Sequence, residues 1–156
     1  MEFFSLTNET VLMFGQIVLA LFLGILLGAE RSFAGKTAGM RTYGLVAMGS
    51  CLLIIISQVG TASFIGVSTF DPMRIAAGII MGIGFIAGGI IIYNERDSSV
   101  SGLTTAAGIW VASGIGIAVG FGLSTIAILT TLLTIFTFSI LWRIEEKFKN
   151  FLNKNI

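Results

Sequence analysis

The stretch GIIMGIGFIAGGIII, residues 78–92, decides the fold class, because it places five glycines among residues that are otherwise all apolar. In water, glycine weakens a helix by about 1 kcal/mol relative to alanine. In a bilayer, helices associate through close van der Waals contact, and small side chains allow that contact. The stretch therefore predicts a membrane helix with smooth faces against which other backbones can pack.

The composition of the whole chain also favours lipid as the solvent. Of 156 residues, 55% are hydrophobic and only 11% are charged, whereas a soluble domain carries about 25% charged residues. The chain contains no histidine, which excludes imidazole bases, Ser-His triads and the usual zinc sites. Cys51 is the single cysteine, so no disulfide can form within the chain. We expect no catalytic residue, no cofactor, no metal site and no nucleic-acid partner.

Five apolar segments are each close to the length of about 20 residues that a spanning helix needs. They predict an all-α integral membrane protein, a bundle of five transmembrane helices in one domain over residues 1–156. The helices are expected near 10–29, 42–59, 73–93, 103–123 and 125–142, with a short tail at 143–156. Asp71, followed by proline, is expected to cap the third helix, and Arg74 can pair with it one turn later.

The distribution of lysine and arginine predicts the orientation. Eight of the nine basic residues fall after the first, third and fifth segments, and Arg74 alone falls on the other side. Because cytoplasmic loops carry the excess of Lys and Arg, we expect the N-terminus outside and the C-terminus in the cytoplasm. Asp71 and Arg74 then form an extracytoplasmic cap pair.

The glycines of the third segment form two stripes at helical spacing, which predicts that this helix is central in the bundle. The segments at 10–29 and 103–123 carry small residues at steps of four, whereas the fifth has no glycine and is expected on the perimeter. Packing and room for a ligand or a permeating solute are the two interpretations. The residues predicted for helix packing or a cavity are Gln16, Gly82, Gly84, Gly88, Gly89, Trp110 and Gly116. Gln16 is expected to form an interhelical hydrogen bond or a ligand contact, and Trp110 to fill the interior or line a pocket.

Charged and hydroxyl residues gather in the segments expected at the cytoplasmic face. Salt bridges, for example between Glu30 and Arg41, are one interpretation of them. The other is a docking site for a protein partner or a small anion, attracted by the start of the fourth helix. The candidate residues are Glu30, Arg31, Arg41, Thr42, Glu95, Thr104 and Thr105.

Three blocks of the sequence resemble the N-terminal membrane domain of the MgtC/SapB family. They are LGILLGAERSFAGKTAGMRTYGLVAMGS at 23–50, DPMRIAAGIIMGIGFIAGGIII at 71–92 and VSGLTTAAGIWVASGIGIAVGFG at 100–122. Ser32 departs from the family pattern, which has a second acidic residue there. The soluble C-terminal domain of longer family members is expected to be absent. The resemblance implies a bacterial inner-membrane protein linked to magnesium limitation, to stress adaptation and to modulation of other membrane proteins.

Two functions follow as hypotheses. The first is a non-enzymatic protein that contacts other membrane proteins, with membrane lipid and a second copy in a homodimer as further expected partners. The second is a small-solute or ion transporter or channel, with a path between the helices at 10–29, 73–93 and 103–123.

Overall fold

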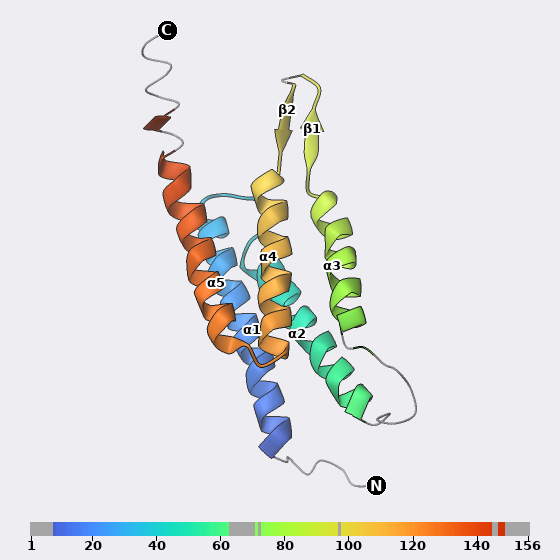
Figure 1. The fold of residues 1–156 in the computed structure, drawn as a ribbon. Helices are drawn as coiled ribbons and strands as arrows, with labels where there is room; N and C mark the ends of the chain where they lie inside the picture. The colour runs from blue at the N-terminus through green and yellow to red at the C-terminus, as the bar shows by residue number, and fades with distance from the viewer. Residues whose placement is uncertain (1–7, 63–70, 72, 97, 145–146, 149–156) are drawn as a thin grey trace.

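A computed structural model describes residues 8–62, 71, 73–96, 98–144 and 147–148. The described elements are five α-helices, one antiparallel hairpin and one π-helical turn. The α-helices are α1 Asn8–Phe33, α2 Met40–Ala62, α3 Met73–Gly88, α4 Leu103–Gly120 and α5 Ser124–Phe136. The hairpin pairs β1 Ile92–Asn94 with β2 Ser99–Ser101, and the π-helical turn is η1 Thr137–Leu141. The helices run side by side, and the hairpin projects from the end of the bundle at which η1 lies (Figure 1).

Four of the described helical stretches are long and apolar enough to cross a membrane, by length and composition. They are Asn8–Phe33, Met40–Gly60, Leu103–Gly120 and Ser124–Ile144, while Met73–Gly88 is apolar but shorter. The protein is therefore a helical, multi-pass membrane protein, as its composition predicts. The tail predicted at 143–156 falls mostly outside the described residues.

The third helix is shorter than the predicted span of 73–93. It ends at Gly88, where the N–H groups of Gly89, Ile90 and Ile91 donate to carbonyls three or four residues earlier and close the last turn. The isoleucines that follow enter the hairpin, in which Ile92 pairs with Ser101. Adjacent glycines have low helix propensity, which a count of apolar residues does not reveal.

The centre of the bundle consists of α1, α2 and α4, which make the most extensive contacts with one another. Glycines let these backbones approach closely. A Cβ atom at Gly24 of α1 would lie 2.5 Å from the carbonyl oxygen of Tyr43, and one at Gly116 of α4 would lie 2.8 Å from the carbonyl carbon of Ala47. The small-residue seams predicted on the first and fourth helices are thus the ones that pack.

The prediction that the third helix is central is wrong. Helix α3 lies at the edge of the bundle and packs mainly on α4 (Figure 1). Its Ile79 and Ile83 belong to a small apolar cluster that also contains Ile54 of α2 and Ile117 of α4. No described heavy atom outside the local backbone lies within 4 Å of a Cβ built at Gly82 or at three other α3 glycines, Gly78, Gly84 and Gly88. Branched side chains, and not the glycine stripes, hold this helix.

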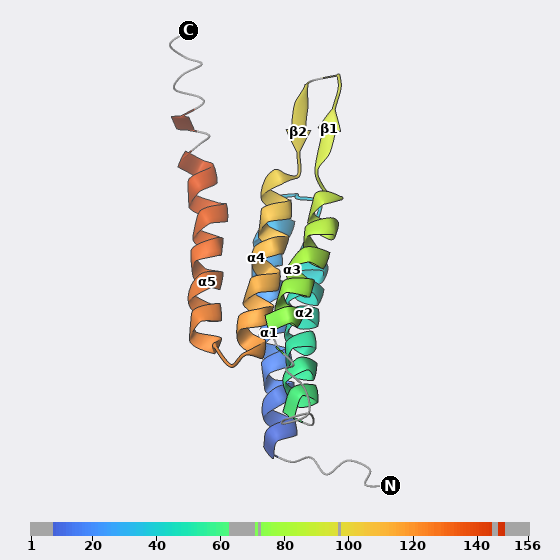
Figure 2. The ribbon, with the colours of Figure 1, turned by 45° about the vertical axis from the view of Figure 1, so that its right-hand side comes forward.

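Helix α5 lies on the other side of α4, as expected for a helix without glycine (Figure 2). Only 22% of the apolar window in Ser124–Ile144 is buried, against 56% for α4. Thr134 and Thr137 donate their hydroxyl hydrogens to carbonyls one turn earlier, at 2.7 and 2.9 Å. These bonds satisfy the hydroxyls within the helix and leave the perimeter apolar.

The start of α3 has the predicted cap. The Asp71 carboxylate accepts a hydrogen bond of 2.9 Å from the N–H of Met73, which is the geometry of an N-cap. The N–H of Arg74 donates to the Asp71 carbonyl at 3.0 Å. Among the ion pairs of the described residues, none joins the side chains of Asp71 and Arg74. The two residues therefore share a helix start without the predicted charge pair.

Candidate functional site

A cavity of about 430 Å³ lies at the end of the bundle where α4 begins. The last turn of α1, the loop that follows it, the start of α4 and the turn η1 all contribute to it. We call it the Arg31 cavity, and its lining includes Arg31, Lys36, Thr104, Thr105, Phe138 and Trp142. It combines two cationic side chains and several hydroxyls with an aromatic wall.

Arg31 is the most deeply buried cation of the described chain, with 4% of its surface exposed. Its Nε donates to the Glu30 carboxylate at 2.5 Å, and Nη2 donates to the Phe138 carbonyl at 3.5 Å. The guanidinium carbon lies 3.9 Å from the centroid of the Phe138 ring, a cation–π contact. A buried charge needs such partners, because an unpaired one is strongly destabilising.

The π-helical turn η1 is the element that brings Phe138 to Arg31. A π-turn inserts one residue into a helix and re-aims the side chains that follow, which is why such turns are frequent at functional sites. On the other side, Gly108 of α4 leaves the space that the Phe138 ring fills, since a Cβ there would lie 2.6 Å from its Cζ. The wall of the cavity therefore depends on one glycine and one irregular turn.

Tyr43 of α2 packs against the same place from inside the bundle. It is fully buried, and its hydroxyl donates to the Thr105 carbonyl at 3.3 Å. A buried tyrosine is stable when its hydroxyl finds an acceptor. This hydrogen bond fixes the first turn of α4 relative to α2 and so holds Thr105 at the cavity.

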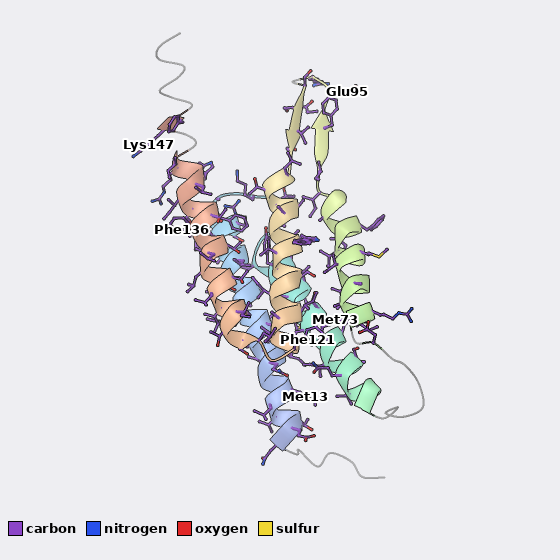
Figure 3. The ribbon with its side chains drawn as sticks, in the orientation of Figure 1. Met13, Met73, Glu95, Phe121, Phe136 and Lys147 are labelled. Carbon is purple, nitrogen blue, oxygen red and sulfur yellow. The ribbon has the colours of Figure 1, made fainter. Side chains whose placement is uncertain are left out.

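The structure brings together four of the seven residues predicted for the docking or anion site. Glu30, Arg31, Thr104 and Thr105 lie at or beside the Arg31 cavity. Glu95 is exposed at the tip of the hairpin and apart from them (Figure 3). The remaining two candidates, Arg41 and Thr42, lie at the start of α2 and do not line the cavity.

The salt bridge expected between Glu30 and Arg41 is not formed, because Glu30 pairs with its neighbour Arg31. Sequence reasoning did not find that Phe138, Trp142 and Tyr43 belong to this site. For Phe138 and Trp142 no local pattern gives a signal, since the π-turn that places them has none. For Tyr43, a phenol inside an apolar segment is a weak signal that a buried acceptor exists.

The residues expected to line a path between the first, third and fourth helices do not converge. Gln16 donates from Nε2 to the Val119 carbonyl at 3.2 Å, which is the interhelical hydrogen bond predicted as one of its two roles. Trp110 is 51% exposed, so the expectation that it fills the interior is wrong. The buried residues of α4 are small or aliphatic, among them Ala112, Gly116 and Ile109, and Trp110 is not one of them. Gly82 is exposed and lines a groove between α2 and α3, and Gly89 lies just past the end of α3.

Within the described part of the chain, no group of three or more acidic or cysteine side chains is placed to hold a metal ion. The site thus consists of a buried cation, its carboxylate partner, a loop lysine and the hydroxyls of α4. Such a set can bind an anion or pair with a charged partner.

These features define a multi-pass helical membrane protein with a polar cavity at one end of its bundle. The comparisons with known proteins make the assignment specific: residues 17–147 match the MgtC family, and the chain belongs to this family. The resemblance read from the three sequence blocks is confirmed.

Three curated relatives illustrate the match. The chain is similar to Protein MgtC of Salmonella typhimurium, with 41% identity over 103 residues, which cover 64% of this chain and 41% of that protein. It is 42% identical over 94 residues to a protein of Escherichia coli named "Putative magnesium transporter YhiD", covering 59% of this chain and 43% of the relative. Protein SrpB of Synechococcus elongatus is 35% identical over 139 residues, covering 84% of this chain and 75% of SrpB.

The matched region is thus less than half the length of MgtC and of YhiD, but most of SrpB. No solved structure gives a significant match to the chain.

Proposed function

We propose that this chain is a non-enzymatic protein of the bacterial inner membrane that modulates other membrane proteins by lateral contact. Membership of the MgtC family and the name of the YhiD relative support a role in magnesium homeostasis, with stress adaptation as its setting. The observation that carries the proposal is the outer face of α3. Its glycines have no packing partner among the described residues of the chain.

The outer face of α3 consists of Gly78, Met81, Gly82, Gly84, Phe85 and Gly88. At 100° per residue these six lie within one half of the helix, and the packed residues Ile79 and Ala87 lie on the other half. Met81 is 79% exposed and Phe85 is 87% exposed. Two residues of this face, Gly78 and Gly82, also line an open apolar groove of about 620 Å³ between α2 and α3.

Glycine on a membrane helix is useful where another backbone comes close, because lipid itself gives no reason to remove a side chain. Four α3 glycines have no described residue packed against them. We therefore place the helix that packs against these glycines in another molecule. Bulky Phe85 and Met81 beside the glycines supply the contact area that such a packing needs. A homodimer through the same face is the related alternative.

The proposed orientation has the N-terminus outside and the C-terminus in the cytoplasm. The positive-inside rule supports it, because Arg31, Lys36 and Arg41 lie at the end of the bundle that would face the cytoplasm. The start of α1 and the turn η1 lie at opposite ends of the bundle (Figure 1), which agrees with an odd number of crossings. The Arg31 cavity then opens toward the cytoplasmic side.

Site-specific photocrosslinking in the native membrane tests the proposal. A photoreactive residue at Phe85 should crosslink to a discrete membrane protein, which mass spectrometry identifies. The same residue at Leu133 of α5, which is 66% exposed, is the matched control and should capture mainly lipid. Gly84→Leu should abolish the Phe85 product without lowering the thermal stability of the isolated protein, because that position is open in the protomer.

Two results would contradict the proposal. Lipid alone at both positions would mean that the outer face of α3 has no protein partner. A second copy of the chain as the sole product would replace a foreign partner with the homodimer.

A further inference from the structure

We infer that the Arg31 cavity binds a phosphate group, through the cations Arg31 and Lys36 and the hydroxyls at the start of α4. The inference does not depend on the partner proposed for α3, which is a different surface of the molecule. Four features of the cavity support it: its charge, the hydroxyl of Thr105, the open start of α4 and the apolar flank.

The cavity has more positive than negative charge. Arg31 and Lys36 line it, while none of its described lining residues is acidic. Glu30 neutralises one of the two cations. On Arg31, Nε is used by Glu30 and Nη2 by the Phe138 carbonyl, and Nη1 makes no hydrogen bond to the described residues. One net positive charge and free guanidinium donors therefore remain for a ligand.

The side chain of Thr105 offers the cavity a hydroxyl that has no hydrogen-bond partner among the described residues. Thr105 is only 5% exposed, and its carbonyl is used by the Tyr43 hydroxyl. Its own side-chain oxygen makes no hydrogen bond to any group in the described ranges, although it lies among the lining residues. A hydroxyl that is reachable from the cavity and unpaired within the described chain can donate a hydrogen bond to a ligand oxygen.

The start of α4 adds backbone donors beside Thr105. The helix is 18 residues long, and its cap residue Gly102 has a φ of 89° and offers no side chain to the first turn. The N–H of Ala106 is used by the Gly102 carbonyl at 2.8 Å, but the N–H groups before it have no helical acceptor. These donors and the helix dipole favour an anion at this point.

Phosphate fits this set of donors better than a carboxylate does. It presents several oxygens in a tetrahedral arrangement, so a guanidinium, an ammonium and hydroxyls can each reach one. The source of the phosphate is either the free anion or the headgroup of an anionic phospholipid. Leu141 and Trp142, which are 50% and 51% exposed, also line the cavity and would flank the acyl chains of such a lipid.

Trp142 provides a direct reporter of binding, because the chain has only one other tryptophan, Trp110. In a Trp110→Phe background, the protein is purified in a maltoside detergent that contains no phosphate. One arm adds inorganic phosphate at constant ionic strength, with chloride as the reference anion. The other arm adds phosphatidylglycerol to the micelles, with a neutral diacylglycerol as the reference lipid. We expect a saturable change of Trp142 emission in at least one arm.

Two variants and one control link that signal to the cavity. Thr105→Val keeps the side-chain shape and removes the hydroxyl. The ligand concentration at half-saturation should rise about tenfold, which is the effect of one lost hydrogen bond to a charged group. Lys36→Gln changes an exposed loop residue, so it tests the site even if Thr105→Val folds poorly. It should also weaken binding several-fold. Lys147→Gln, a lysine that does not line the cavity (Figure 3), should leave binding unchanged.

The two arms identify the source of the phosphate. A response to inorganic phosphate alone assigns the site to the free anion, and a response to phosphatidylglycerol alone assigns it to a lipid headgroup. A response to both shows that the site recognises the phosphate group that the two share. No saturable change in either arm would overturn the inference. An equal response to chloride, or binding that neither Thr105→Val nor Lys36→Gln weakens, would overturn it as well.

Discussion

Replacing Gly116 with alanine should destabilise the protein, although alanine is the better helix former. A Cβ at this position would meet the backbone of Ala47, 2.8 Å from its carbonyl carbon and closer still to its oxygen. Backbone atoms cannot move to another rotamer, so α2 and α4 must separate. Overpacking of this kind costs about 3 kcal/mol at the upper end of its range. The gain in helix propensity offsets about 1 kcal/mol, which leaves a net loss of about 2 kcal/mol.

Gly84→Ala is the matched control, because it makes the same chemical change in a membrane helix with no described atom within 4 Å of the new methyl group. We expect this variant to be as stable as the parent or more stable, by up to about 1 kcal/mol. Reversible unfolding in mixed micelles, with increasing sodium dodecyl sulfate and helical circular dichroism as the signal, gives both values. A Gly116→Ala protein as stable as the parent, or equal losses in the two variants, would refute the close α2–α4 approach as the source of stability.

Three further substitutions test individual contacts by the same unfolding measurement. Glu30→Gln leaves the buried Arg31 without its counter-charge and should cost about 3 kcal/mol; an unchanged midpoint would show that Arg31 does not need the carboxylate. Tyr43→Phe removes the hydrogen bond to the Thr105 carbonyl and should cost about 1 kcal/mol, so a stabilised variant would contradict that bond. Gln16→Leu removes a bond between α1 and α4 and should cost at most about 1 kcal/mol, and a larger loss would mean that Gln16 has a role beyond it.

The predicted helix boundaries agree with the structure where a charged residue lies directly beside a long apolar run, as Glu30 does after 10–29 and Arg41 does before 42–59. The run at 10–29 lies inside Asn8–Phe33, and the run at 42–59 lies inside Met40–Ala62. The predicted end of the third helix, at residue 93, is wrong because the apolar composition continues past the helix into the hairpin at 92–101. An isoleucine contributes equally to a membrane helix and to a strand, so composition alone does not mark the change.

The candidate site was predictable in its chemistry and not in its geometry. The sequence places charged and hydroxyl residues in the segments expected at one face of the membrane, and this pattern predicted a polar site there. The sequence could not tell that Glu30 pairs with Arg31 instead of Arg41, or that Phe138 from the far end of the chain covers the guanidinium. Those contacts depend on where α1 and η1 cross, which no local pattern encodes.

The sequence by itself determined that this protein consists of apolar helices in lipid, because hydropathy and length are properties of each segment alone. It also determined that glycine seams bring backbones together. Only the tertiary structure decided which glycines do so: Gly24 and Gly116 touch neighbouring backbones, whereas Gly82 and Gly84 have no described atom packed against them. The physical reason is that a missing side chain permits close approach but exerts no attraction of its own. The complementary surface that fills the space is contributed by a distant part of the chain, or by another molecule.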